Sequence, residues 1–285
     1  MTASLLVEIQ TEELPPKALK ALCGAFASGI ESGLRARGLV SDQSVMTVYG
    51  TPRRLAVYLT HVAKKSTDTS FRQKLLPVSI GLDDKGKATP ALQKKLAALG
   101  VEVEVKKLKR ESDGKQEVLV YEGHKPGELL IAVLQPVIEA TIAALPVPKM
   151  MSYQLFDGET TTRFVRPAHH LIAMHGHAVV PVHALGLQSG TKTQGHRFLA
   201  PGILTVLAPE MYSEQLLDEG YVIASFEERR AKIESLLLAE ARKHDALPVV
   251  PADLLDEVTA LVEWPVVYAS TFDAEYLSVP PECLL

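Results

Sequence analysis

The strongest structural constraint in this sequence is an apolar stripe at helical spacing between residues 16 and 37. Its members recur every three or four residues: Leu19, Leu22, Phe26, Ile30 and Leu34. Such spacing places apolar side chains on one face of a helix. Pro15 and Pro16 indicate the start, because a proline in the first turn leaves no N–H unpaired, and Gly38 indicates the end. The segment therefore predicts an amphipathic helix with one buried face.

Strand patterns lie on both sides of this helix. The apolar run 4–9 precedes it and ends in a polar turn, and the segments 45–49 and 54–62 follow it. The later strand and helix patterns show no regular βαβ repeat. The sequence therefore predicts an α+β protein with mixed strands and helices.

The remaining elements are predicted from periodicity and from proline and glycine breaks. The expected helices are 90–99, 127–145, 209–219, 226–243 and 253–262, and the expected strands are 118–121, 169–175, 178–187, 203–207 and 264–269. Residues 64–87 are polar and rich in turn formers, which is typical of a loop or hairpin tip. Pro146 and Pro148 end the long central helix, so we expect two α+β lobes, 1–148 and 149–285.

Charge is distributed unevenly along the 285 residues. Residues 1–150 contain 21 Lys and Arg against 16 Asp and Glu, whereas residues 151–285 contain 9 and 18. This asymmetry argues against a uniform nucleic-acid surface and makes the amino-terminal half the better candidate for RNA contact. Its lysine-rich strings at 94–95 and 106–110 are more simply explained as solvated faces.

No apolar run approaches the roughly 20 residues of a membrane helix, and no secretory leader is apparent, so we expect no membrane association and a cytoplasmic location.

The sequence carries no recognisable catalytic signature. It has no Gly-x-Ser-x-Gly elbow and no glycine-rich phosphate loop, and Cys23 and Cys283 lack the spacing of a metal or redox pair. Five histidines fall between residues 169 and 183, but no Cys, Asp or Glu lies among them to complete a metal site. We therefore expect no catalytic residue, no metal and no cofactor in these residues.

Short charge-dense strings set against apolar runs are more informative. They are 11–16 (TEELPP), 51–56 (TPRRLA), 164–167 (FVRP), 195–198 (GHRF) and 226–230 (FEERR). In this order and spacing they resemble the amino-terminal part of the beta subunit of bacterial tetrameric glycyl-tRNA synthetases. The resemblance also includes 5–9 (LLVEI), 256–265 (DEVTALVEWP) and 279–282 (VPPE), so it runs through nearly the whole chain.

This resemblance implies a non-catalytic subunit region of glycine–tRNA ligase, an aminoacyl-tRNA synthetase of protein biosynthesis. Such a region supports tRNA(Gly) binding and α2β2 assembly for ATP-dependent glycylation. In that family the alpha subunit holds ATP, glycine and magnesium, which agrees with the lack of adenylate motifs here. The fragment by itself is expected to be inactive, and no DNA partner is expected. The resemblance also implies that the polypeptide continues into a helical domain related to HD phosphohydrolases, and later into an anticodon-binding domain.

The region is also distantly similar to the B3/B4 module of the phenylalanyl-tRNA synthetase beta subunit. That module serves hydrolytic editing, so one alternative is an editing-type hydrolase acting on mischarged tRNA, with a cleft lined by His196, Arg166 and Glu12 or Glu13. Because glycine is the smallest amino acid, a binding pocket can exclude larger side chains sterically, which reduces the need for a separate editing site. A protein interaction module without RNA contact is the other alternative.

The candidate contacts to tRNA or to a partner subunit are Arg53, Arg54, Arg166, His196 and Arg197. Guanidinium groups form paired hydrogen bonds with phosphates and carboxylates. Because Arg53 and Arg54 are adjacent on a predicted strand, one is expected to face inward and one outward. The structural alternative is an internal ion pair with Glu12 or Glu13. Arg166 and Arg197 each lie near an aromatic and a turn residue. Such a pairing can stack a nucleic-acid base and hold a phosphate, and the structural alternative is that it anchors a turn to the core.

Overall fold

The computed structural model describes residues 2–83, 85–99, 105–112, 114, 116–155 and 157–283. Its contacts divide the chain into two compact units: Met1–Lys65 with Leu129–Leu285, and Ser66–Glu128. This division differs from the lobe boundary expected at residue 148. Strands β1 (Thr2–Thr11) and β9 (Ala168–His175), on opposite sides of that boundary, are antiparallel neighbours in one sheet.

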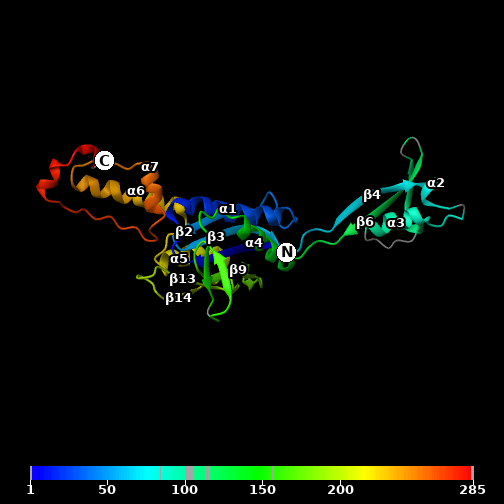
Figure 1. The fold of residues 1–285 in the computed structure, drawn as a ribbon, viewed down its shortest axis with the longest axis horizontal. Helices are drawn as coiled ribbons and strands as arrows, with labels where there is room; N and C mark the ends of the chain where they lie inside the picture. The colour runs from blue at the N-terminus through cyan, green and yellow to red at the C-terminus, as the bar shows by residue number, and fades with distance from the viewer. Residues whose placement is uncertain are drawn as a thin grey trace. The chain divides into compact units, whose positions relative to one another are not determined.

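The first unit is built on a five-stranded antiparallel sheet in the order β10-β9-β1-β3-β2. Figure 1 labels three of these strands, β2, β3 and β9. Its other strands are β2 (Met46–Thr51), β3 (Arg54–Ala63) and β10 (Ala178–Val179). At the centre, Val7 of β1 lies opposite Val57 of β3 and Ala173 of β9. The strands predicted at 4–9, 45–49, 54–62 and 169–175 are confirmed.

Helices cover one face of this sheet. Helix α1 (Pro16–Arg35) buries the predicted stripe against α4 (Leu130–Ala144) and against alternate β1 residues such as Val7 and Ile9. Alternation along a strand turns the intervening residues, such as Leu6 and Glu8, to the opposite face. Both faces of β1 are therefore buried.

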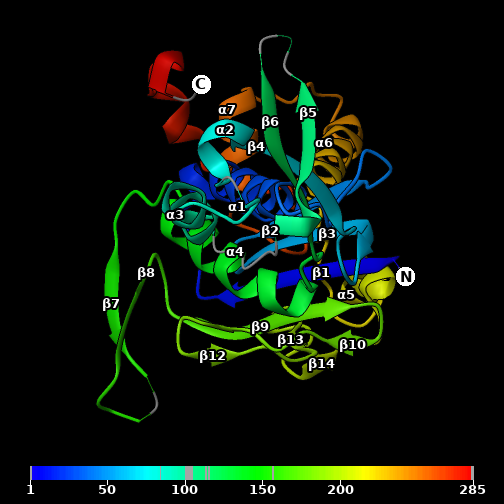
Figure 2. The ribbon, with the colours of Figure 1, turned by 90° about the vertical axis from the view of Figure 1, so that its right-hand side faces the viewer.

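The opposite face is covered by segments from later in the chain (Figure 2). They are β13 (Lys192–Gln194), β14 (Ile203–Thr205) and α5 (Tyr212–Asp218). Leu6 packs there with Tyr212 and Leu216, in a second apolar cluster. This layer brings residues near 194 to the ends of β1 and β3, where the candidate site lies.

Two predicted strands in this unit are wrong. The segment 178–187 forms short pieces, β10, β11 (His183–Ala184) and part of β12 (Leu187–Gln188), because Pro181 lacks an N–H and Gly186 adopts a positive φ of 78°. The segment 264–269 is irregular, and the Trp264 ring packs edge-on against Tyr221 instead of joining a ladder.

Helices α6 (Phe226–Lys243) and α7 (Ala252–Thr259) confirm the predicted helices, and the hairpin β7 (Met151–Gln154) and β8 (Thr161–Phe164) was not predicted.

The second unit is a small α+β structure with its own core. Its sheet has the order β4-β6-β5, with strands β4 (Thr69–Pro77), β5 (Lys109–Ser112) and β6 (Glu117–Lys125). Helices α2 (Val78–Gly81) and α3 (Pro90–Ala98) pack on it around Leu92 and Leu119. The predicted loop or hairpin tip at 64–87 is wrong over residues 69–81, which form β4 and α2, but right near its end, where Asp83 N–H donates to the Lys87 carbonyl in a tight turn. β4 is an edge strand whose side chains are mostly exposed, so its polar composition hides the strand.

The mixture of helices and antiparallel sheets confirms the α+β class. Among the residues that the structure describes, no helix is both long and apolar enough to cross a membrane.

Candidate functional site

A buried polar layer lies beneath the sheet, centred on Glu8 of β1. The side chain of Glu8 is fully buried, Thr193 Oγ1 donates a hydrogen bond to it at 2.5 Å, and the Tyr212 hydroxyl donates another. Burial, followed by the nearby Glu8 charge, raises the pKa of Tyr212 well above its ordinary value, so the phenol keeps its proton. Glu8, the one acidic residue in the apolar run 5–9, thereby receives hydrogen bonds from two other segments.

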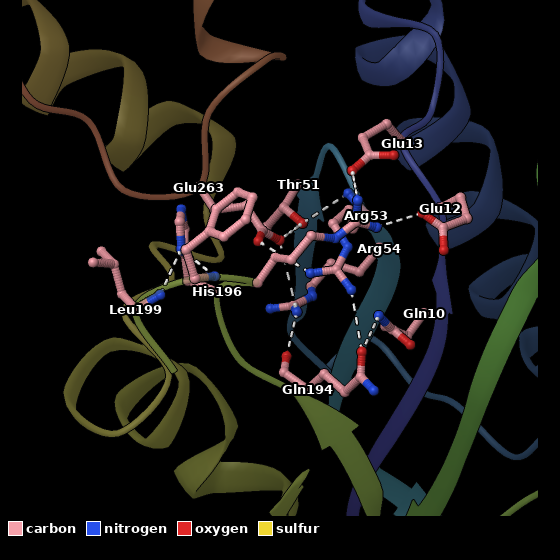
Figure 3. Close-up of polar contacts among 12 residues, drawn as sticks. Gln10, Glu12, Glu13, Thr51, Arg53, Arg54, Gln194, His196, Leu199 and Glu263 are labelled. Carbon is pink, nitrogen blue, oxygen red and sulfur yellow. Dashed lines mark hydrogen bonds and ion pairs between the residues drawn. The ribbon is translucent and has the colours of Figure 1, made fainter. Parts of the chain in front are cut away.

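Arg53 and Arg54 are both buried, with 6% and 0% of their surface exposed. The expectation that one of them faces outward is wrong. Arg53 lies in the turn before β3, and Arg54 is the first residue of β3. Arg53 Nη2 donates to Gln194 Oε1 at 3.1 Å, and Arg54 Nη2 donates to the Gln194 carbonyl at 2.6 Å. Figure 3 shows both arginines between Gln194 and Glu263.

Glu263 supplies the carboxylate nearest to these arginines. Its oxygens lie 3.9 Å from Arg53 and 3.7 Å from Arg54, and Thr51 Oγ1 donates to it at 2.7 Å. Burial lowers the pKa of Arg53 although Glu263 opposes the effect. For Arg54 burial also acts to lower the pKa, but the nearby acidic groups, Glu263 first, outweigh it and raise the pKa.

Sequence reasoning missed Glu263 as an ion-pair residue. The sequence did hold a sign of this role: Glu263 is an acidic residue between the apolar Val262 and Trp264, inside the 256–265 string that supports the family resemblance. The expected partners of Arg53 and Arg54 were Glu12 and Glu13, whereas these two pair with Arg197.

Glu12 joins three segments at the edge of the buried layer. Arg197 Nη2 lies 2.5 Å from Glu12 Oε2, and Arg197 Nη1 lies 3.1 Å from Glu13 Oε1. His169 Nε2 lies 2.8 Å from the other Glu12 oxygen. Burial by itself would raise the pKa of Glu12, but the hydrogen bonds from Arg197 and His169 outweigh it and hold the pKa below its ordinary value. Glu12 is therefore a carboxylate that stays ionised at neutral pH.

A polar pocket of about 400 Å³ opens between these groups. It is lined by Glu12, Arg53, His169, Gln194, Gly195, Arg197 and Pro201. Beside and beneath it, the Nε and Nη1 atoms of Arg53 and of Arg54 have no hydrogen-bond partner within the described part of the chain. Unpaired buried donors are costly, so the positive charge of these two arginines is only partly compensated by Glu263. The described residues include no cluster of three or more His, Cys, Asp or Glu able to hold a metal ion.

Arg166 and His196 do not line this pocket. Arg166 Nε donates to the Glu13 carbonyl at 2.8 Å. His196 Nδ1 accepts from the backbone N–H groups of Phe198 and Leu199 at 3.3 and 3.2 Å. Both side chains thus fix turns, and the pocket that Glu12 lines includes neither of them.

Arg229 is a further buried arginine that was considered only as part of a helix start. That start is present, since Ser225 Oγ caps α6 by accepting from Glu228 N–H. Arg229, however, is fully buried and donates to the carbonyls of Gly50 and Thr259 at 2.9 and 3.1 Å. Burial lowers its pKa to about 10. It therefore ties β2 and α7 to the base of α6.

Known proteins are similar to this chain over nearly its whole length. Residues 5–285 match the family model described as "Glycyl-tRNA synthetase beta subunit". The chain belongs to the glycyl-tRNA synthetase beta subunit family. The resemblance found in the charged strings is therefore confirmed, and it extends through both units of this beta subunit family member.

Curated relatives agree with this family. The glycine–tRNA ligase beta subunit of Leptothrix cholodnii is 50% identical over 284 residues, which are 99% of this chain and 40% of that protein. The corresponding proteins of Acidovorax sp. (strain JS42) and Dechloromonas aromatica are 50% and 48% identical, each over 99% of this chain. The chain spans about two fifths of the length of these relatives.

Proposed function

We propose that this chain is the region of a glycine–tRNA ligase beta subunit that supports tRNA(Gly) binding and α2β2 assembly. The observation that carries the proposal is the family match over residues 5–285. In this proposal the alpha subunit binds ATP and Mg²⁺ and performs the adenylate chemistry in the cytoplasm, while this region acts on tRNA and on the assembly. The proposal includes a fold related to the B3/B4 module of the phenylalanyl-tRNA synthetase beta subunit.

The polar pocket supports a binding role. Arg53 and Arg197 line it, and the guanidinium group suits phosphate and carboxylate oxygens. Among the predicted contact residues these two are the candidates for direct contact with tRNA or with the alpha subunit. Arg54, Arg166 and His196 do not line the pocket and instead bond to backbone groups, so we assign them to holding the surrounding turns and strand ends in place.

An editing hydrolase receives less support from the same pocket. A general base works best with a pKa near the operating pH. Glu12 is the carboxylate in the pocket lining, and Arg197 and His169 hold its pKa below the ordinary value. It is therefore a weak base for activating water, and we do not assign hydrolysis to it.

A deletion tests the proposed function. Purified alpha subunit is combined either with the full-length beta subunit or with a beta subunit lacking residues 1–285, and glycylation and the mass of the complex are measured. Normal assembly with a collapse of charging is the outcome expected if the region acts on tRNA, and a failure to assemble is expected if it joins the subunits. Unchanged charging and unchanged assembly would contradict both parts of the proposal.

A further inference from the structure

The second unit contains an open pocket of about 760 Å³ with a basic rim. Its lining combines basic with apolar side chains and one glycine: Lys85, Lys87, Lys106, Arg110, Leu82, Ala88, Val105, Leu108, Leu119 and Gly86. The basic side chains are exposed, whereas Leu82, Leu108 and Leu119 of the floor are buried. Among the described residues, none in this lining is acidic.

Two other basic residues in this unit, Lys109 and Arg72, are neutralised by ion pairs, whereas the rim cations pair with no carboxylate among the described residues. Lys109 lies 2.7 Å from Glu122, and Arg72 pairs with Glu111. Arg110 is adjacent to Lys109 on β5, so its side chain projects from the other face of the strand, beside its register partner Leu119. Within the described residues, the four rim cations form no ion pair with a carboxylate.

The loop that carries two of the rim lysines is held by Asp83. Asp83 Oδ1 accepts from the backbone N–H groups of Lys85 and Lys87 at 3.0 and 2.7 Å. Gly86 between them adopts a φ of 72°, a conformation that residues with a side chain rarely adopt. These hydrogen bonds fix the backbone N–H groups of Lys85 and Lys87, and both residues line the pocket rim.

We propose that this pocket binds the sugar–phosphate backbone of tRNA. This inference rests on the proposed function and adds a second tRNA-binding surface to the polar pocket of the first unit. Phosphodiester groups require cations that are not already neutralised, and the four rim residues meet that requirement. The pocket volume falls in the range of small-molecule sites, which suits one nucleotide unit. The apolar floor offers a surface on which a ribose or the face of a base can pack. An acidic protein held only by charge would not need such a floor, so the floor favours RNA as the occupant.

The test replaces the four rim residues in the complete α2β2 assembly. One variant carries K85Q, K87Q, K106Q and R110Q in the beta subunit. The matched control carries K74Q, K94Q, K95Q and K107Q, four exposed lysines of the same unit that do not line the pocket. Affinity for tRNA(Gly) is measured across a series of KCl concentrations, together with the mass of each assembly and its unfolding by urea.

We expect the rim variant to bind tRNA(Gly) at least about tenfold more weakly, with the slope of log affinity against log salt reduced by about 3, because each lost phosphate contact removes roughly 0.7–0.9 from that slope. The control should retain most of the affinity and slope. Equal losses in both variants would indicate diffuse charge and overturn the pocket assignment.

Two other outcomes would also overturn it. If the rim variant binds tRNA like the unmodified assembly, the pocket does not contact RNA, and the deletion of residues 1–285 then decides separately whether the proposed function survives. If the rim variant fails to assemble with the alpha subunit, the pocket faces an acidic surface of that subunit instead.

Discussion

The guanidinium of Arg54 lies 3.7 Å from the carboxylate of Glu263, and at most 4% of either side chain is exposed. Arg54 begins β3, whereas Glu263 belongs to the irregular segment after α7. Removing one partner of a buried pair leaves the other charge without compensation, which is far more costly than losing an exposed pair. The end of the central sheet therefore depends on a segment from the far end of the chain.

Replacing Glu263 by Gln should destabilise the protein strongly. The change leaves Arg53 and Arg54 buried without their nearest carboxylate, and we expect the free energy of unfolding to fall by about 3 kcal/mol. Urea unfolding followed by circular dichroism measures it. Glu234→Gln is the matched control, because Glu234 is exposed and lies 3.9 Å from Arg230, so it should change stability by less than about 1 kcal/mol. Equal effects of the two variants would disprove a special role for Glu263.

The Arg197–Glu12 contact should make stability depend on pH. Because the pKa of Glu12 is lowered in the folded protein, the stabilisation is fully present above the ordinary pKa of 4.5 and is lost as the pH falls through the lowered value. Arg197→Ala should thus lower stability at neutral pH, by at most about 1 kcal/mol for a partly exposed pair, and the difference should vanish in acid. Unfolding at a series of pH values measures this. Arg163→Ala, at an exposed position, should show no such pH-dependent difference.

Two glycines should respond in opposite directions to replacement by alanine. A Cβ at Gly50 would overlap Cys23 Sγ, so Gly50→Ala should destabilise the protein by about 1–3 kcal/mol. A Cβ at Gly24, inside α1, would meet nothing within 4 Å, so Gly24→Ala should stabilise by up to about 1 kcal/mol through helix propensity. Thermal melting of both variants checks the signs, and a stabilising Gly50→Ala would show that β2 and α1 pack less closely there.

The two cysteines should differ in reactivity. Cys23 is 4% exposed and burial raises the pKa of its thiol to about 12, whereas Cys283 is exposed. Because the thiolate is the reactive form, iodoacetamide should label Cys283 and leave Cys23 unmodified in the native protein. Peptide mass spectrometry reads the sites, with urea-unfolded protein as the control in which both react. Labelling of native Cys283→Ser protein at Cys23 would contradict the buried position.

Local pattern was enough to predict most of the helices and the strands of the central sheet. The apolar stripe from Leu19 to Leu34 became α1, and the Ser225-capped segment became α6. The charged strings also identified the family, and three residues of the polar pocket, Glu12, Arg53 and Arg197, were among the predicted site residues. These features depend on neighbours along the chain, which a sequence displays directly.

Only the tertiary structure decided which distant residues meet. Arg53 and Arg54 are both buried because Gln194 and Glu263, from two later segments, contact both of them, and their nearest carboxylate comes from Glu263 instead of the nearby Glu12. The pairing of β1 with β9, and the separate folding of Ser66–Glu128, likewise come from contacts between remote segments. Periodicity indicates that a face is buried, but the partner that buries it is selected by packing across the whole unit.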